Sequence, residues 1–350
     1  MFDKLNKKAI VIVLSASIIA FLLLGFFTIR NILGDGDAIF SIRPEVPPNQ
    51  NRIVLNNDHL DLIFSPLPKY GYEGFSVGIY ESEWNGDIRL EEGQEYITIQ
   101  VNNAGFADLN LLLKVFYNYE ELDFQIVGTS ETKTELLFIL EGNHQVHIPI
   151  YLPEILEDFA NKDSISKLTI GVFFEPEYFV INEPILSERL PLTALMLNYE
   201  INYGLNANLI LRTAPVIPSG EEPFVGFSVY TEPEPPGCGG LWGRNYVVAQ
   251  RGRPLELTFF ANEELNAEKY LIVSMLDWYQ IPMNGEPYLW VETPNAQQGM
   301  GQYGTFTIEV PDEVGFYEFF AFLVPHPTSP HAAHTFFPLE TRRFTIEVIE

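Results

Sequence analysis

The sequence GFSVGIY at residues 74–80 returns in a shortened copy, GFSVY, at residues 226–230. In both copies apolar side chains alternate with small or polar ones, which predicts strands with one buried face. Behind each copy come a second strand, then a strand that a proline ends (Pro153 or Pro311), and then a long apolar strand. The same elements in the same order predict two copies of one domain. Chance similarity between β-proteins is the alternative.

The composition favours strands over helices along the chain. Aromatic residues make up 14% of the 350 residues, and glycine and proline number 25 each. Aromatic side chains suit strands, whereas glycine and proline suit the turns between them. Residues 153–161 are an exception, because an initial proline, early acids and apolar spacing predict a short helix there. We therefore predict an all-β chain of two β-sandwiches, with this helix inserted in the first.

A motif near the C-terminus indicates the kind of sandwich. The stretch EVGFY at residues 313–317 resembles the Asp-x-Gly-x-Tyr tyrosine corner of immunoglobulin-like domains. The resemblance implies that Gly315 adopts a turn conformation and that the Tyr317 hydroxyl bonds upstream backbone. Glutamate stands where the family usually has aspartate, and Phe319 stands where an immunoglobulin carries its second cysteine.

The resemblance covers residues 222–350 well and residues 73–212 more faintly. It implies tandem immunoglobulin-like sandwiches of the bacterial cell-surface type, with Trp278 in the core near strand C. We expect each sandwich to fold by itself. The predicted parts are a cytoplasmic tail (residues 1–8), a transmembrane anchor (9–29), a spacer (30–52), the first sandwich with its short helix (53–212), a proline-rich linker (213–222) and the second sandwich (223–350).

The predicted anchor begins at Ala9 and ends at Ile29, and it contains no charged residue. As a helix it would be about 31 Å long, which is the hydrocarbon thickness of a bilayer. Basic residues precede it and Asp35 and Asp37 follow it, so the N-terminus is expected in the cytoplasm and the rest outside. The alternative is a cleaved signal peptide, whose apolar core is usually shorter.

The charge of the chain excludes a large class of partners. The formal net charge is −27, and residues 1–30 are basic, so the remainder carries −30. A surface this acidic repels nucleic acid, which we do not expect as a partner. Cys238 is the only cysteine, so no disulfide can form within the chain.

Three histidines near the C-terminus form the clearest cluster of potential metal ligands in the sequence. His326, His331 and His334 lie within nine residues, and three imidazoles at such spacing are able to bind zinc or copper. The alternative is a loop between the last two strands that carries histidines by accident. No other cofactor is expected.

Aromatic side chains offer a second candidate site. Tyr288 and Trp290 share one face of a predicted strand, and Trp242 lies in an earlier loop. Together they are able to form a stacking platform for sugar, although such residues fill the cores of sandwiches more often than they bind ligands.

No catalytic constellation emerges. GFSVG at residues 74–78 fits the Gly-x-Ser-x-Gly nucleophile motif, but Ser76 lies inside a predicted strand instead of at a strand-to-helix turn. We therefore expect a non-enzymatic, membrane-anchored, extracytoplasmic binding or scaffold protein, acting in adhesion or with a protein partner in the envelope. The alternatives are a cell-surface carbohydrate-binding module that takes a glycan, and a metal-binding accessory protein that uses the histidine loop.

Overall fold

The part of the chain that the structure describes lies within the unit Val46–Glu350. The predicted tail, anchor, spacer and short helix lie outside the described residues. The computed structural model describes residues 63–66, 74–82, 87–88, 94–104, 108–152, 166–177, 194–201, 211, 213–216, 218–223, 227–230, 246–262, 269–292, 300–328, 338–341 and 343–350. Among these residues, no helix long and apolar enough to span a membrane is found.

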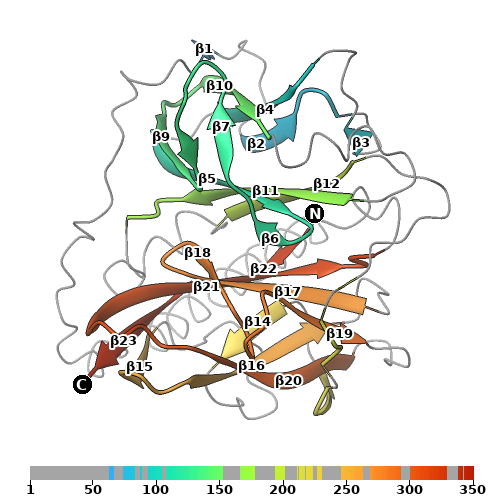
Figure 1. Ribbon diagram of the computed structural model, residues 1–350, viewed down its shortest axis with the longest axis vertical. Helices are drawn as coiled ribbons and strands as arrows, with labels where there is room; N and C mark the ends of the chain where they lie inside the picture. Colours follow the sequence, from blue (N-terminus) through green and yellow to red (C-terminus); the bar gives the residue numbers. More distant parts are fainter. Residues whose placement is uncertain are drawn as a thin grey trace, which may run out of the picture. The chain divides into compact units, whose positions relative to one another are not determined.

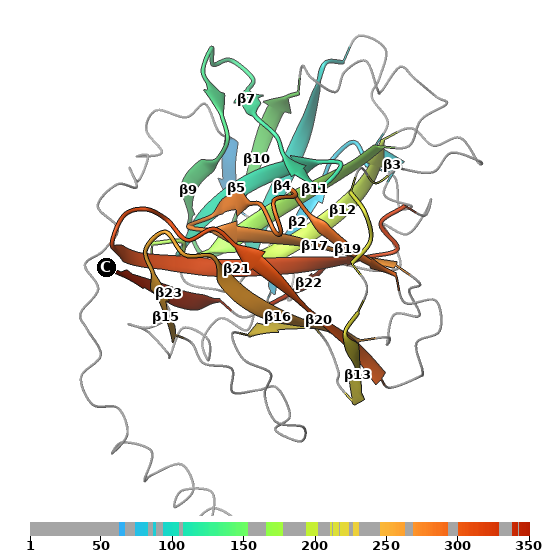
Figure 2. The ribbon, with the colours of Figure 1, turned by 60° about the horizontal axis from the view of Figure 1, so that its bottom comes forward.

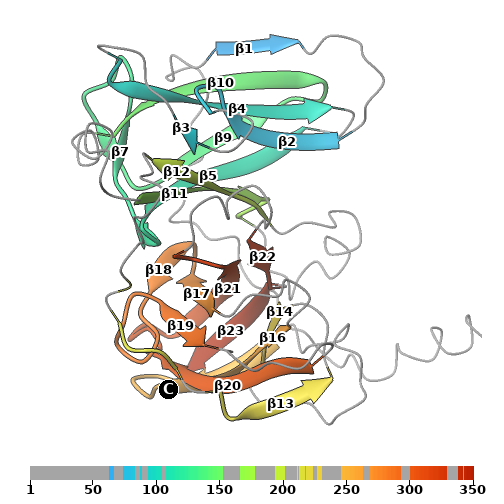
Figure 3. The same cartoon turned by 90° about the vertical axis from the view of Figure 1, so that its right-hand side faces the viewer.

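The described residues form strands and no helix, so the all-β prediction is confirmed. The first half of the chain builds two sheets, which Figure 3 shows as two layers. One has the order β2 (Gly74–Ile79), β4 (Tyr96–Ala104), β10 (His144–Tyr151), β7 (Phe124–Ile126), β8 (Thr132–Lys133), with β1 (Ile63–Pro66) also on β10. The other has the order β3 (Asp87–Ile88), β12 (Ala194–Ile201), β11 (Ser166–Phe174), β5 (Leu109–Tyr117), β6 (Glu120–Glu121), with β9 (Leu136–Leu140) also on β5.

The second half of the chain builds another pair of sheets (Figure 1). One has the order β13 (Gly220–Pro223), β20 (Met300–Ile308), β16 (Leu255–Asn262), β14 (Phe227–Tyr230). The other has the order β15 (Tyr246–Gln250), β23 (Phe344–Ile349), β21 (Gly315–Pro325), β17 (Lys269–Leu276), β18 (Tyr279–Ile281), with β19 (Leu289–Glu292) on β17 and β22 (Leu339–Glu340) on β21.

The strand pairing repeats between the halves. In the first sheet of each half, the GFSV strand pairs with a second strand, which pairs with a third: β2–β4–β10 and β14–β16–β20. In the other sheet a short strand runs parallel to the last long strand, β3 beside β12 and β15 beside β23. The two halves therefore share one topology, as the repeated sequence predicted.

Each sandwich has its own apolar core, built by the alternation of its strands. In β4, for example, Ile97, Ile99 and Val101 are buried, whereas the residues between them are partly exposed. They pack with Ile170 and Val172 of the facing sheet in one cluster. An equivalent cluster in the second sandwich contains Leu257 and Phe259 of β16.

The predicted linker at residues 213–222 is in part a strand. Gly220–Pro223 forms β13 and pairs with β20, and the Val216 amide donates to the Trp290 carbonyl at 2.8 Å. The prolines that predicted a linker are compatible with this arrangement, because a proline interrupts a sheet edge less than a central strand. The second sandwich therefore begins earlier than residue 223.

Candidate binding surfaces

A third apolar cluster joins the two sandwiches. It combines residues of β5, β11 and β12 with residues of β17 and β21, so one sheet of each sandwich packs against the other. Phe173 of the first sandwich lies 5.1 Å from Trp278 and 5.4 Å from Phe320 between ring centroids, and Phe116 lies 5.4 Å from Phe322. Figure 2 shows β5 and β11 near β17 and β21. The two sandwiches therefore share an apolar cluster in addition to their own cores, and independent folding of each stays a prediction.

Two tight turns form matching parts of this contact. Asn118 and Tyr119 connect β5 to β6 with φ of 48° and 71°, and Asp277 and Trp278 connect β17 to β18 with φ of 47° and 70°. Two successive positive φ values define a type I′ hairpin turn, which favours Asn or Asp first. The side chains of Asn118 and Asp277 each accept a backbone N–H at 2.9 Å, which fixes both turns.

The aromatic residue of each turn reaches across to the other sandwich. The Tyr119 hydroxyl donates to the Pro327 carbonyl at 2.9 Å, and the Trp278 indole N–H donates to the Pro176 carbonyl at 3.0 Å. Burial raises the pKa of the Tyr119 phenol, which keeps it a hydrogen-bond donor. Both rings are buried. Trp278 therefore lies between the sandwiches. The sequence analysis had placed it in the core of the second sandwich.

A reciprocal pair of hydrogen bonds joins the residues that follow these two turns. The Glu121 amide donates to Gln280 Oε1 at 2.6 Å, and the Gln280 amide donates to Glu121 Oε2 at 3.0 Å. Glu121 follows the first turn by two residues, and Gln280 follows the second turn by two residues. Such exchange between equivalent positions is the signature of a two-fold axis, here between two halves of one chain.

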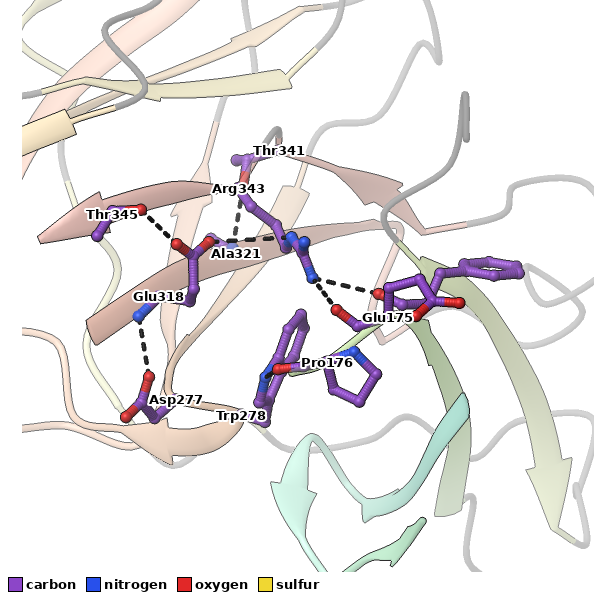
Figure 4. Close-up of polar contacts among 10 residues, drawn as sticks. Glu175, Pro176, Asp277, Trp278, Glu318, Ala321, Thr341, Arg343 and Thr345 are labelled. Atoms are coloured by element: carbon purple, nitrogen blue, oxygen red, sulfur yellow. Dashed lines mark hydrogen bonds and ion pairs between the residues drawn. The ribbon is translucent and has the colours of Figure 1, made fainter. Parts of the chain in front are cut away.

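A buried ion pair lies at one end of this contact (Figure 4). Glu318 and Arg343 form an ion pair of 3.9 Å, and Thr345 donates to Glu318. Arg343 also donates to the backbone carbonyls of Phe174 and Glu175 of the first sandwich, at 3.2 and 3.1 Å. Burial holds the pKa of Arg343 below its ordinary value, and the nearby carboxylates of Glu318 and Glu175 oppose this effect. The positive charge of the guanidinium is therefore balanced by Glu318 in the second sandwich and by backbone carbonyls of the first.

The first sandwich has its own buried pair at the matching place. Lys167 pairs with Glu200, and both side chains are buried. Lys167 faces Glu200 across β11 and β12 as Glu318 faces Thr345 across β21 and β23. The equivalent positions therefore hold opposite charges, lysine in one half and glutamate in the other.

The predicted aromatic platform is buried in the contact between the sandwiches. Tyr288 is 2% exposed and Trp290 is 9% exposed, and both belong to the shared cluster. The Trp290 indole N–H donates to the Thr213 carbonyl at 2.7 Å. The prediction that these two residues form a ligand platform is therefore wrong, because another sheet covers their face. Trp242 lies outside the described residues.

The histidine cluster is described only at His326. This residue has φ of 49°, and its amide donates to the Lys269 carbonyl at 3.0 Å in the turn that ends β21. Glu175, with φ of 46° and a bond to the Asn110 carbonyl, occupies the matching turn after β11. His331 and His334 lie outside the part of the chain that the structure describes. Within that part, no group of three potential metal ligands occurs.

The tyrosine-corner motif places Tyr317 in β21. Its hydroxyl donates to the Glu313 carbonyl at 2.9 Å, the upstream backbone bond of a tyrosine corner. Burial is the main cause that raises the pKa of Tyr317, with Glu313 and Asp277 contributing. The expectation for Gly315 needs correction: the glycine begins β21 and is not among the glycines with positive φ. A methyl group there would lie 3.7 Å from the Tyr317 ring, an ordinary contact.

Tyr317→Phe is expected to lower the free energy of unfolding by about 0.5–1.5 kcal/mol, the usual net value of one hydrogen bond. The Glu313 carbonyl lies in an exposed contact and is able to turn to water, which limits the loss. Urea unfolding of the full chain measures it, with Tyr80→Phe as the control because Tyr80 is 74% exposed. Equal stability of the two variants would show that the corner bond contributes nothing.

An open surface lies on the outer face of β2, β4 and β10. Its first part is a row of neutral side chains that we call the polar ladder: Ser76, Gln100, Asn102 and Gln145. Asn102 Nδ2 donates to Ser76 Oγ at 3.0 Å. Gln100 Nε2 donates to Asn102 Oδ1 at 3.2 Å and to Gln145 Oε1 at 3.1 Å. These bonds fix which way each amide points.

The second part of this surface is a group of tyrosines, which we call the tyrosine end: Tyr80, Tyr96 and Tyr151. Tyr96 and Tyr151 are directly paired on neighbouring strands, and their strand neighbours Ile97 and Ile150 are buried, so both tyrosines face outward. Tyr80 and Tyr96 are 74% and 41% exposed. The sequence analysis missed this group, because its members come together only when the strand register is known.

A carboxylate anchors the backbone beside the tyrosine end. Glu81 accepts from the Thr98 amide at 2.7 Å, from the Thr98 hydroxyl at 3.0 Å and from Gln94 Nε2 at 3.0 Å. The Tyr80 amide donates to the Thr98 carbonyl at 2.9 Å. The segment that carries Tyr80 is thereby held to β4.

The matching face of the second sandwich differs. Ser76–Asn102–Gln145 form one row across the first sheet, and the equivalent row is Ser228, Phe260 and Tyr303. Phe260 and Tyr303 lie 5.5 Å apart between ring centroids, and Phe260 is buried. The open polar ladder therefore belongs to the first sandwich alone.

Comparisons with known proteins identify no family. No family model and no curated protein matches the chain. Among solved structures, a red sea bream transglutaminase shares 10% identity over 79% of this chain and 31% of its own, with a TM-score of 0.20. The periplasmic chaperone SfaE shares 12% identity over 78% of this chain and 100% of its own, with a TM-score of 0.22. Fibronectin(III)-like modules of Clostridium thermocellum CbhA share 9% identity over 78% and 93%, with a TM-score of 0.20.

Proposed function

We propose that the chain is a membrane-anchored, extracytoplasmic binding or scaffold protein without catalytic activity, in which two immunoglobulin-like sandwiches act as one unit. The observation that carries this proposal is the shared apolar cluster with its reciprocal hydrogen bonds. Sandwiches held in this way keep their outer sheets in a fixed arrangement, which suits a protein that presents surfaces to a partner.

The sequence supports the location in this proposal. An uncharged stretch at residues 9–29 follows lysines and precedes acids, the pattern of an anchor whose C-terminal side is outside. The remainder of the chain carries −30, which favours solubility and disfavours nucleic acid. The partner that we infer is another protein of the cell envelope.

The topology is tested by adding protease to intact cells that express the full chain with a C-terminal tag. We expect loss of the tag with survival of a small membrane-bound fragment, because residues 30–350 would be outside. Cells with permeabilised membranes, and a cytoplasmic marker protein, control for leakage. Full protection of the tag in intact cells, or a mature N-terminus well after residue 25, would contradict the anchored topology.

A further inference from the structure

The outer face of β2, β4 and β10 has few charged side chains, in contrast to the acidic chain as a whole. Charged residues make up 19% of the sequence, mostly acidic. On this face the outward positions, those that alternate with the buried core residues, carry no aspartate, glutamate, lysine or arginine. The Glu81 carboxylate, beside Thr98, already accepts three hydrogen bonds, and the outward positions offer a polyanion no lysine or arginine. The surface therefore fits a neutral ligand.

We propose that the polar ladder and the tyrosine end bind an extended, neutral polysaccharide outside the cell. This inference rests on the proposed extracytoplasmic function and names the ligand class of one of its surfaces. A sugar chain presents hydroxyl groups at its edges and C–H groups on its ring faces. The ladder offers amide donors and acceptors to the hydroxyls, and the tyrosine rings offer apolar faces with a polar hydroxyl.

The amides of the ladder are fixed before any ligand arrives. Gln100 gives both hydrogens of its Nε2 to Asn102 and Gln145, which leaves its Oε1 directed away from these bonds. Asn102 gives one hydrogen of its Nδ2 to Ser76 and retains a second. Groups that are already oriented lose little entropy on binding, so a weakly held hydroxyl-rich chain benefits from them.

The dimensions also suit an extended chain. The ladder row at Asn102 and the tyrosine row at Tyr96 are separated by six residues of β4, about 20 Å in an extended strand. Between these two rows the outward positions are Thr98 and Gln100 of β4, with Gly78 of β2 on one side and His147 and Pro149 of β10 on the other. A polysaccharide is able to lie along β4, with its rings against Tyr80 and Tyr96 at one end and its hydroxyls against the ladder at the other.

The second sandwich supplies an internal comparison. At its matching outward positions Pro254 and Glu309 replace Tyr96 and Tyr151, and Phe260 replaces Asn102. Glu309 is an exposed acid and Phe260 is buried. At these matched positions the second copy has neither the amides of the polar ladder nor the tyrosines of the tyrosine end, so the fold itself does not require these residues.

Isothermal titration of the full chain in detergent tests the proposal with cellohexaose, mannohexaose and fully N-acetylated chitohexaose as neutral probes and polygalacturonate as the acidic probe. We expect at least one neutral probe to bind and the acidic probe to fail. Tyr80→Ala and Tyr96→Ala are each expected to weaken binding about tenfold. Tyr279→Ala is the matched control, because Tyr279 is 50% exposed in the second sandwich and should leave the affinity unchanged.

Circular dichroism confirms that each variant is folded before its affinity is compared. The proposal is overturned if no neutral probe binds, if polygalacturonate binds as well as the neutral probes, or if binding survives replacement of both Tyr80 and Tyr96. Each of these results leaves the protease test of the topology untouched. Failure of the ligand class is thus distinguishable from failure of the extracytoplasmic function.

Discussion

Trp278→Ala is expected to lower the free energy of unfolding of the chain by about 3–5 kcal/mol, the usual loss for a large buried aromatic residue. The substitution empties the space beside Phe173 and Phe320 in the contact between the sandwiches. It also removes the donor that satisfies the Pro176 carbonyl. Because the lost contacts join both sandwiches, both should unfold at lower urea concentration.

Urea unfolding of the full chain in detergent, followed by far-ultraviolet circular dichroism, measures this effect. Tyr80→Ala is the control, with an expected loss under about 0.5 kcal/mol because the side chain is largely exposed. Trp278→Phe keeps a ring in the contact and removes only the hydrogen bond, so its loss should lie between the two. If Trp278→Ala leaves the first sandwich as stable as before, the two sandwiches do not share a core.

Glu318→Ala is expected to cost about 3–5 kcal/mol, because it leaves the buried Arg343 guanidinium without its carboxylate. The matched control is Glu292→Ala, which breaks the exposed Lys269–Glu292 pair of 3.4 Å and should cost under about 1 kcal/mol. The difference between the two isolates the effect of burial, since each substitution removes one glutamate from one ion pair.

A double variant sharpens this second test. Removing the charge of Arg343 as well, in Glu318→Ala with Arg343→Met, should recover part of the stability, since the unpaired charge is then absent. Urea unfolding of the parent, Glu318→Ala, Arg343→Met and the double variant gives the coupling energy between the two side chains. A loss for Glu318→Ala no larger than that for Glu292→Ala would mean that water reaches the guanidinium, contrary to its burial.

The strands and their repetition could be predicted because the period of two is local. β4 reads as alternating apolar and polar residues, and its buried side chains follow that alternation. The contact between the sandwiches left a different signal. β21 is continuously apolar from Phe319 to Pro325, β5 is apolar apart from Asn110 and Lys114, and both strands are buried along most of their length. Such runs are typical of strands covered on both faces, but the sequence analysis did not use them and expected two independent sandwiches.

The predicted sites fared less well for a physical reason. Tyr288 and Trp290 have large apolar rings with one polar group, which suits a ligand platform and a contact between sheets equally. Only the packing partner separates the two roles. The tyrosine end had the opposite difficulty, because Tyr96 and Tyr151 lie on two strands and Tyr80 directly follows a third, and no local pattern defines the register of these strands.

The order of synthesis gives the shared core a further consequence. A ribosome completes residues 53–212 before residues 223–350, so the first sandwich emerges without its counterpart. Until the second is made, Leu112, Phe116 and Phe173 face water as an apolar patch. Exposed patches of this kind promote aggregation of incomplete chains. The interval between the two halves is therefore the period in which a nascent chain most needs protection, whereas the finished protein hides the same surface permanently.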